Sequence, residues 1–448
     1  MSIKLKYLNK ELKVSNEKIY VVPSDIETVI YKGFRLIISP SNGNWIVIEN
    51  QLQMNIFLDI ELGLSVGKLI GKYAKSLEEL KKVLVQIEGK HFDEIINIQE
   101  ESFPLRLYLT NNCNLRCKHC FMYASNELKN ELSTDEIKRL IDKCYEYGSD
   151  KIIFTGGEVA LKEGFIEILK YAKIIGMYTQ VLTNGTLWTT QMINEGAKYI
   201  DDLQVSVDGY NEMSNARIRG SGVFDKALET VDEFIKIGGL SVSVSVTPLY
   251  DFIDEYYEKY IKFGRQLVEK YKNDDFLIIF GRELIDGRDI NASEEKNRLM
   301  ADRVDKIAED IYPNNELTAF VRNHEHNRIF RNCGYGALTV NSNGDFYFCG
   351  RVNDVRKYGN IRQVPIEHVL EIRKKVREIS QVDNLLPCKN CLLKYICGGG
   401  CRVTQFPQIT QCDIENIDFS KIKARECSQN YINNFYRLMI ESNDFLLW

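Results

Sequence analysis

The sequence predicts an α/β fold: a partial (β/α)6 barrel of the TIM type, with a winged-helix-like module before it and a cysteine-rich extension after it. From residue 105 on, short apolar runs alternate with longer amphipathic stretches, which is typical of βαβ units and a parallel sheet. Six such units, two fewer than a full barrel has, predict a barrel that is open on one side. The 12 cysteines are grouped, with three at 113–120 and eight between 333 and 427.

The barrel elements follow one another in regular alternation. Strands are expected at residues 105–110, 151–155, 178–183, 203–207, 241–247 and 276–280. Helices are expected at residues 134–147, 162–175, 189–196, 223–237, 253–271 and 293–311. Ser133 and Glu136 fit a capping box at the start of the first helix. Because parallel strands share one carboxyl edge, the reactive loops are expected to follow these strands.

Residues 1–95 form the predicted winged-helix-like module. Its β-rich runs are residues 19–22, 34–38 and 45–48, with a strong turn at residues 41–44. Helices are expected at residues 50–61, 65–74 and 76–89, the last with a capping box of Ser76 and Glu79. A β-ribbon followed by three short helices also occurs in DNA-binding proteins and in stabilising caps. No helix here is rich in Lys and Arg, which argues against DNA binding.

Length and composition bound the function. With 448 residues, two or three domains are expected, and we place them at residues 1–95, 96–315 and 316–448. Hydrophobic residues are 44% and charged residues 27%, as in soluble globular proteins. A net charge of −5 gives no support for nucleic-acid binding. The sequence shows no signal-peptide pattern and no run of 18 apolar residues. We therefore expect a cytoplasmic protein without membrane contact, whose cysteines bind metal.

Three thiols lie close together directly after the first barrel strand. Cys113, Cys117 and Cys120 have the spacing C-x3-C-x2-C. A [4Fe–4S] cluster normally takes four thiolates, so three local ligands leave one iron free for a small molecule. Structural zinc is the alternative, but it requires four ligands, usually in pairs. Cys144 is predicted to be a core thiol on the first barrel helix.

This loop resembles the signature of the radical S-adenosylmethionine (SAM) superfamily, C-x3-C-x-aromatic-C, with His119 in the aromatic position. The resemblance implies a partial barrel, in agreement with the strand and helix pattern. It also implies that the open iron chelates the amino and carboxylate groups of SAM. Cleavage of SAM then gives a 5′-deoxyadenosyl radical, which abstracts hydrogen from the substrate. The protein supplies position and exclusion of water.

Later strand ends resemble the SAM-binding motifs of the same superfamily. Gly156-Gly157-Glu158, after the second strand, resembles the motif that meets the SAM amino group, although Val159 replaces the usual proline. The alternative is a plain turn. Asn184, after the third strand, resembles the T-N-G turn of the superfamily, and a loop cap is the alternative.

The last three strands carry weaker matches. Ser206 matches a serine that the superfamily places at the SAM ribose or carboxylate, and Arg219 matches an arginine that faces the carboxylate. Asn215 and Ala216 depart from the usual His and Asp, and a surface salt bridge is the alternative for Arg219. Ile278, on the sixth strand, is expected to contact adenine.

The C-terminal cysteines resemble the SPASM extension of radical SAM peptide modifiers, which binds two auxiliary [4Fe–4S] clusters. The central block reads C-x2-C-x5-C-x3-C. The resemblance implies that auxiliary cluster I is held by Cys333, Cys349 and Cys401, and auxiliary cluster II by Cys388, Cys391, Cys397 and Cys427. Cys412 is left with three possible roles: completing cluster I, exchanging with Cys427, or lying buried as a plain thiol. A treble-clef-like zinc site is the alternative for this region.

The N-terminal module resembles the peptide-recognition element of enzymes that modify ribosomal peptides, in which a leader peptide adds a strand to the sheet edge. The whole chain is therefore similar to sactisynthases and ranthipeptide synthases. These resemblances imply a maturase with three [4Fe–4S] clusters and SAM that installs a thioether, from a Cys sulfur to carbon, in a precursor peptide. A ferredoxin or flavodoxin would supply electrons. The alternatives are a carbon–carbon cross-linking cyclase, an anaerobic sulfatase (formylglycine) maturase, and a non-enzymatic electron carrier or peptide scaffold.

Overall fold

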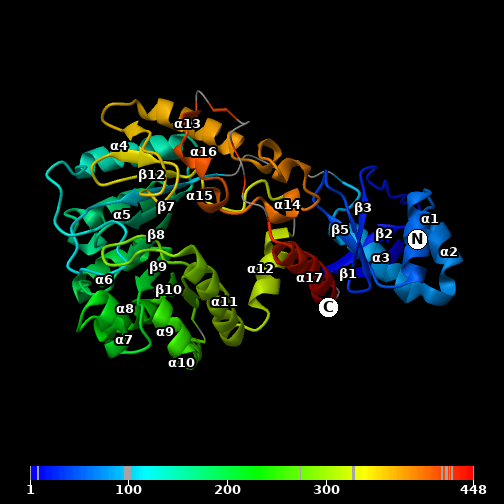
Figure 1. Ribbon diagram of the computed structural model, residues 1–448, viewed down its shortest axis with the longest axis horizontal. Helices are drawn as coiled ribbons and strands as arrows, with labels where there is room; N and C mark the ends of the chain where they lie inside the picture. The colour runs from blue at the N-terminus through cyan, green and yellow to red at the C-terminus, as the bar shows by residue number, and fades with distance from the viewer. Residues whose placement is uncertain are drawn as a thin grey trace. The chain divides into compact units, whose positions relative to one another are not determined.

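The computed structural model describes residues 2–7, 10–94, 102–272, 274–324, 328–414, 417–418, 422, 424 and 427–446. The chain forms two compact units (Figure 1). The first comprises residues 1–101, 316–334 and 377–448, and the second comprises residues 102–315 and 335–376. The predicted SPASM segment, residues 316–448, thus contributes to both units. Among the described helices, none combines the length and the apolar character needed to cross a bilayer.

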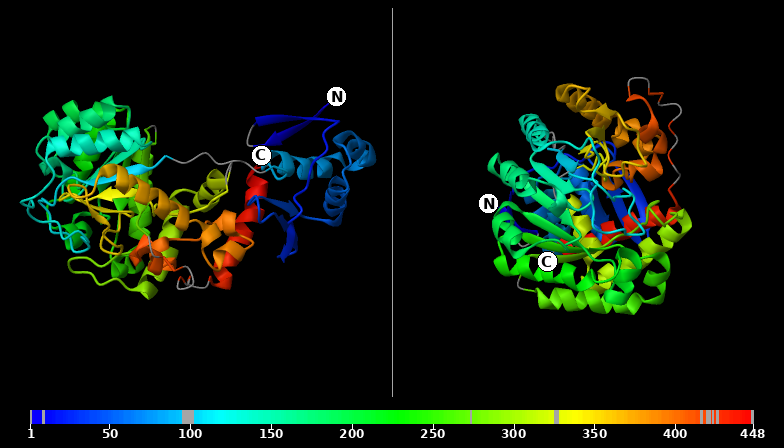
Figure 2. Two further views of the ribbon diagram at one scale, coloured as in Figure 1. Left: turned by 90° about the horizontal axis from the view of Figure 1, so that it is seen from above. Right: turned by 90° about the vertical axis from the view of Figure 1, so that its left-hand side faces the viewer.

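The second unit is built on parallel strands in chain order, as the sequence predicts. In the described residues these strands are β6 (Pro104–Tyr108), β7 (Lys151–Thr155), β8 (Tyr178–Thr183), β9 (Asp202–Ser206), β10 (Ser241–Val246) and β11 (Phe276–Phe280). Each strand pairs in parallel with its sequence neighbour, so the six carboxyl ends meet at one edge. The connecting helices lie on the outside of the curved sheet (Figure 2). The α/β prediction is therefore confirmed.

The helices of this unit also follow the prediction, with two exceptions. They are α4 (Thr134–Glu146), α5 (Phe165–Ile174), α6 (Thr190–Gly196), α7 (Glu212–Arg219), α8 (Phe224–Ile237), α9 (Tyr250–Glu255), α10 (Tyr257–Lys270) and α11 (Glu294–Ile311). The capping box at Ser133 and Glu136 is present, and Cys144 is buried on α4 as expected. Helix α7 was not predicted. The helix expected at residues 253–271 is broken at Tyr256, where the backbone leaves the helical region.

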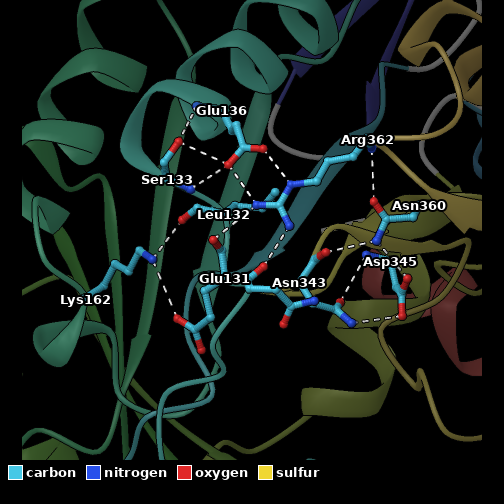
Figure 3. Close-up of polar contacts among 10 residues, drawn as sticks. Glu131, Leu132, Ser133, Glu136, Lys162, Asn343, Asp345, Asn360 and Arg362 are labelled. Atoms are coloured by element: carbon cyan, nitrogen blue, oxygen red, sulfur yellow. Dashed lines mark hydrogen bonds and ion pairs between the residues drawn. The ribbon is translucent and has the colours of Figure 1, made fainter.

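Three short strands from the C-terminal part extend this sheet. β12 (Leu338–Val340) pairs in parallel with β6, and β13 (Asp345–Tyr347) and β14 (Gly359–Asn360) follow in antiparallel order. Arg362, just after β14, forms an ion pair with both carboxylate oxygens of Glu136, at 2.6 and 2.9 Å (Figure 3). It also donates to the carbonyl oxygens of Asn130 and Glu131. Hydrogen bonding from Arg362 lowers the pKa of Glu136 to about 2. This bidentate contact fixes the added strands to the start of α4.

The first unit holds the winged-helix-like elements and helices from the C-terminal part. Its strands are β1 (Ser2–Tyr7), β2 (Lys10–Ser15), β3 (Glu27–Tyr31), β4 (Phe34–Ile38) and β5 (Trp45–Ile48). Its longer helices are α1 (Gln51–Glu61), α2 (Val66–Lys72), α3 (Leu77–Gly89), α12 (Asn315–His324) and α17 (Gln429–Leu446), and α13 (Ile366–Ile379) begins in the second unit. Its short helices are α14 (Lys394–Cys397), α15 (Arg402–Gln405) and α16 (Pro407–Gln411).

Two local predictions for this unit are wrong. Residues 19–22 form no strand, since Ile19 and Val21 point into solvent, and the strand that pairs with β4 comes later, at β3. Ser76 makes no side-chain capping bond. The Glu79 carboxylate instead accepts hydrogen bonds from Asn50 and Gln53, because α1 packs beside α3. The turn at residues 41–44 is confirmed by the Ser39–Asn44 backbone bond.

Strands β4 and β5 of the sheet β3–β4–β5 are buried on both faces. Successive side chains of a strand point to opposite faces. Ile37, Ile46 and Ile48 pack against the helices α1 to α3. Leu36, Ile38 and Val47 form a second core with residues of α12, α14 and α17. The C-terminal helices therefore complete a module that the sequence presents as independent.

Lys90 is buried where these layers meet. Among the described residues its amine has no hydrogen-bond partner, and it lies 4.7 Å from the centre of the Trp45 ring. A small cavity beside it is lined by Tyr7, Asn44, Trp45, Phe320, Val321, His324 and Ser442. Burial lowers the pKa of Lys90 to about 7. The amine therefore destabilises the fold when it is charged.

Lys90 is expected to make stability rise with pH. The unfolded lysine has a pKa of about 10.4, so between pH ~7 and ~10.4 the unfolded chain binds more protons. Below pH ~7 both states are protonated and the effect is constant. Lys90→Met should raise the free energy of unfolding at pH 7 by a few kcal/mol (order of magnitude) and remove the slope. Denaturation at several pH values measures both effects. The exposed Lys68→Met is the control, and equal curves for the two variants would contradict the prediction.

Candidate active site

The loop after β6 is closed on itself and presents three thiols. Cys113 N–H donates to the Ser125 carbonyl, and Cys120 N–H donates to that of Cys117. Cys113, Cys117 and Cys120 are free and half-buried. Burial raises the pKa of Cys117 to about 11, and the other two thiols add to this shift because they lie nearby.

The arrangement suits a cluster better than a single ion. Within the part of the chain that the structure describes, no three His, Cys, Asp or Glu side chains converge as ligands of one metal ion. In a [4Fe–4S] cluster each thiolate binds a different iron, so the sulfur atoms need not converge on one point. The three neighbouring free thiols fit that requirement.

Gly156-Gly157-Glu158 packs directly against this loop. A Cβ on Gly157 would lie 2.1 Å from the carbonyl oxygen of Asn112, so only glycine allows this approach. Gly156 has φ +140°, which also favours glycine. Gly157 N–H donates to Thr110 O at 2.7 Å, and Glu158 N–H donates to Asn112 O at 2.8 Å. The motif is therefore a tight seam between the loops that follow β6 and β7.

The Glu158 side chain joins the third loop to this seam. Its buried carboxylate accepts the Thr183 hydroxyl at 2.6 Å and the Asn184 backbone N–H at 2.8 Å. Burial raises the pKa of Glu158. The Asn184 side-chain amide donates to Asn114 Oδ1 at 2.9 Å and lies 4.0 Å from the Cys113 sulfur. Of the residues predicted to bind SAM, Gly156, Gly157, Glu158 and Asn184 thus lie together beside the thiols.

Asp208, after β9, is the polar centre of the other side of the site. Its Oδ2 lies 2.7 Å from His119 Nε2 and 2.6 Å from Arg219 Nε, and its Oδ1 accepts the Thr247 N–H at 2.8 Å. Burial favours the protonated acid, but Arg219 and His119 outweigh it and lower the pKa of Asp208 to about 2. The carboxylate thus stays ionised and holds two cationic or polar groups of the site.

Arg219 is not a surface residue. Only 10% of its side chain is exposed, and its Nη1 lies 3.9 Å from the Cys117 sulfur. The surface salt bridge considered as an alternative is therefore wrong, because the pair with Asp208 is buried. Ser206 ends β9 half-buried, and Ile278 is buried on β11.

Asp208 itself was missed in the sequence. The signal was an acidic residue at a strand end, with the basic residues His119 and Arg219 in other motifs of the site. Helix α7, which was also missed, carries Arg219, and its Ile218 carbonyl accepts a hydrogen bond from the Lys118 N–H of the cysteine loop. The charged residues on this side of the site therefore come from two connections, the cysteine loop and the segment between β9 and β10.

None of the 12 cysteines, all of which lie in the described residues, forms a disulfide. In the first unit, Cys388, Cys391, Cys397 and Cys427 lie near one another. Burial is the main cause that raises the pKa of Cys388 to about 12, and the other three thiols add to the effect. The Cys397 sulfur is 3.4 Å from the Tyr431 hydroxyl.

The remaining late cysteines fall in both units. Cys333 and Cys401 lie in the first unit, where both interact electrostatically with the Arg402 guanidinium. Cys349 follows β13 in the second unit. The Cys412 thiol donates to the Ile409 carbonyl at 3.3 Å.

Asp208→Asn is expected to destabilise the protein strongly. The variant keeps the shape of the side chain but leaves the buried Arg219 guanidinium without its counter-charge. Loss of one partner of a buried pair costs about 3–5 kcal/mol. Chemical denaturation of the apo-protein measures the loss. Asp310→Asn, which removes an exposed pair with Arg265, is the control and should cost under about 1 kcal/mol. Equal losses for the two variants would contradict the assignment.

Comparisons with known proteins agree with this geometry. The family model of the radical SAM superfamily matches residues 107–264, and that of the iron–sulfur cluster-binding SPASM domain matches residues 332–392. Fe-coproporphyrin III synthase of Methanosarcina barkeri is 32% identical over 51% of this chain and 58% of its own length, so this match spans little more than half of that relative. Mycofactocin maturase MftC of Mycolicibacterium smegmatis is 24% identical over 66% of this chain and 77% of its own.

A solved structure shows the same fold. The native anSMEcpe structure with bound AdoMet and Cp18Cys peptide has a TM-score of 0.52 and 19% identity, and it covers 76% of this chain and 96% of its own. The radical SAM match begins within β6 and includes the cysteine loop, the Gly156–Glu158 seam and Asp208. These domains imply that SAM and several [4Fe–4S] clusters are the cofactors. This chain contains a radical SAM domain, which belongs to a superfamily of enzymes, and a SPASM iron–sulfur domain.

Proposed function

We propose that this enzyme installs a thioether cross-link, from a Cys sulfur to carbon, in a ribosomally made precursor peptide whose leader binds the first unit. The observation that carries the proposal is the open edge of the sheet β3–β4–β5. Among the described strands, β3 pairs only with β4. An edge strand of this kind offers its free N–H and C=O groups to an added strand.

The opposite edge of the sheet is closed. Gln86 of α3 accepts the Val47 N–H at 2.8 Å and donates to the Val47 carbonyl at 3.0 Å, so that both backbone groups of this β5 residue are satisfied by a side chain. On β3, by contrast, the Ile30 side chain is 73% exposed. A leader peptide that adds a strand would therefore pair with β3 and cover Ile30. The apolar area that it buries favours binding.

The relatives support a peptide substrate. MftC is named a maturase, and the solved structure of the same fold holds AdoMet and a peptide. A carbon–carbon cross-linking cyclase is the second candidate, because the same edge would serve its peptide. The 32% identity to Fe-coproporphyrin III synthase favours a tetrapyrrole substrate instead, and the N-terminal sheet argues against it.

The residues of the site would hold the cofactors in a fixed frame. When bound, SAM and the cluster at Cys113, Cys117 and Cys120 supply hydrogen-atom abstraction from a substrate carbon. Glu158 and Asp208 lock the surrounding loops by the buried contacts described above. Preorganised contacts of this kind hold reacting groups in position without further cost during the reaction.

The cross-link removes two hydrogens from the peptide. Abstraction accounts for one hydrogen atom, and the electron of the second must pass to a one-electron acceptor. Cys388, Cys391, Cys397 and Cys427 would hold one acceptor, and Cys333, Cys349 and Cys401 another, with Cys412 available to the second. A cytoplasmic ferredoxin or flavodoxin would supply the electron that starts each cycle.

Anaerobic reconstitution tests the enzyme itself. Reduced protein with SAM is expected to release 5′-deoxyadenosine and to contain about 12 iron atoms per chain, from three clusters. Replacing Cys113, Cys117 and Cys120 together by Ala should abolish the product and remove about 4 of these iron atoms. Cys144→Ala, a buried thiol outside the site, is the control and should retain both. Product formation by the triple variant would overturn the assignment of the loop.

Ile30→Lys tests the peptide edge. The leader strand would have to cover the new lysine charge and remove it from water. The variant is therefore expected to weaken binding of a synthetic precursor peptide by at least about tenfold. Fluorescence anisotropy measures the affinity, and mass spectrometry counts the hydrogens lost from the peptide. Leu62→Lys, an equally exposed apolar residue at the end of α1, is the control. Unchanged affinity in Ile30→Lys would refute strand addition at β3.

A further inference from the structure

Arg402 is a fully buried cation in the first unit. Its relative exposure is 0%, and it lies at the start of α15, one residue after Cys401. The guanidinium donates to carbonyl oxygens on three separate segments. These are Ser380 at 2.6 and 2.8 Å, Gly398 at 3.0 Å, Gly400 at 2.6 Å and Phe330 at 3.4 Å. All hydrogen bonds of the guanidinium therefore go to backbone carbonyl groups.

No carboxylate balances this charge. Within the described residues, no Asp or Glu oxygen lies within ion-pair distance of Arg402, and carbonyl groups provide dipoles but no net charge. A buried charge is normally paired or associated with a metal site, because removal from water costs several kcal/mol per ion. An unbalanced guanidinium at 0% exposure thus indicates a missing anion nearby.

Four thiols interact electrostatically with the Arg402 guanidinium. They are those of Cys333, Cys388, Cys397 and Cys401. Two belong to the proposed ligand set of auxiliary cluster I and two to that of auxiliary cluster II. As neutral thiols they do not balance the guanidinium, but as metal-bound thiolates they do.

The backbone around Arg402 is built for close approach. Gly398, Gly399 and Gly400 all have positive φ, between +67° and +82°. A Cβ on Gly398 would lie 2.4 Å from Ile329, and one on Gly399 would lie 3.1 Å from Arg402 Nη1. The three glycines therefore let the chain between Cys397 and Cys401 wrap around the guanidinium.

We propose that Arg402 is the shared counter-ion of both auxiliary clusters: a positioning residue whose fixed charge favours their reduced forms. One-electron reduction adds a negative charge to a cluster, and a buried cation nearby stabilises that charge. The same charge makes the apo-protein unstable, so that binding of the clusters stabilises the unit. The inference rests on the proposed ligand roles of these cysteines.

The experiment compares three full-length proteins in which Cys113, Cys117 and Cys120 are replaced by Ala, so that only auxiliary clusters are present. These carry Arg402, Arg402→Lys and Arg402→Gln. Lysine keeps the charge, whereas glutamine keeps donors but no charge. Anaerobic reconstitution with iron and sulfide is followed by iron analysis, by potentiometric titration monitored by electron paramagnetic resonance, and by thermal unfolding before and after reconstitution.

Arg402→Gln is expected to lower the reduction potentials of both clusters and to reduce the gain in melting temperature on reconstitution. Arg402→Lys should keep the potentials near those of the parent while binding less iron. Arg373→Gln, which removes another buried guanidinium, stacked 3.7 Å from the Phe103 ring in the second unit, is the control and should leave the potentials unchanged.

Two results would overturn the proposal. One is that Arg402→Gln titrates at the parent potentials, and the other is that Arg402→Lys shifts them as far as Arg402→Gln does. If Arg402→Gln does not accumulate, the lysine variant alone decides, since parent potentials support the role of charge and shifted ones refute it. Iron loss in Cys388→Ala tests the ligand assignment separately. Failure of that assignment is thus distinct from failure of the role given to Arg402.

Discussion

The buried carboxylate of Asp208 is the contact on which the geometry of the candidate site depends. It joins His119 of the cysteine loop, Arg219 of α7 and the backbone after β10, three segments far apart in the sequence. Each of these contacts would be weak on the surface, but at 1% exposure a carboxylate cannot exchange its partners for water. The position of the β9 end relative to the thiols therefore follows from charge balance.

Glu158 plays the corresponding part on the other side of the site. Its carboxylate binds Thr183 and the Asn184 backbone, while its own backbone binds Asn112 of the cysteine loop. The two acids together connect the loops that follow β6, β7, β8, β9 and β10. A site that binds a cofactor through several loops needs such fixed connections, because loops by themselves are mobile.

The first unit combines elements that the sequence keeps far apart. One face of its sheet packs on α1 to α3, and the other packs on helices that lie next to the proposed ligands of auxiliary cluster II, with Cys397 itself contacting that core. The open edge at β3 and the wrapped guanidinium of Arg402 thus belong to one packed unit. In the proposed function, peptide binding and cluster binding would stabilise the same hydrophobic cores.

The sequence by itself determined the barrel strands, most of the helices, the cysteine loop and the Gly156–Glu158 motif. These are local: hydrophobic periodicity, caps such as Ser133 with Glu136, and thiol spacing act over a few residues. Prediction from the sequence failed where residues far apart in the chain compete for the same hydrogen-bond or strand partner. Residues 19–22 have strand composition but no partner, whereas β3 pairs with β4, and Glu79 prefers Asn50 and Gln53 to a capping box. Only the tertiary structure decided that Asp208 pairs with His119 and Arg219, and that Arg402 lies among four thiols, because burial and charge balance depend on segments that meet only in the folded chain.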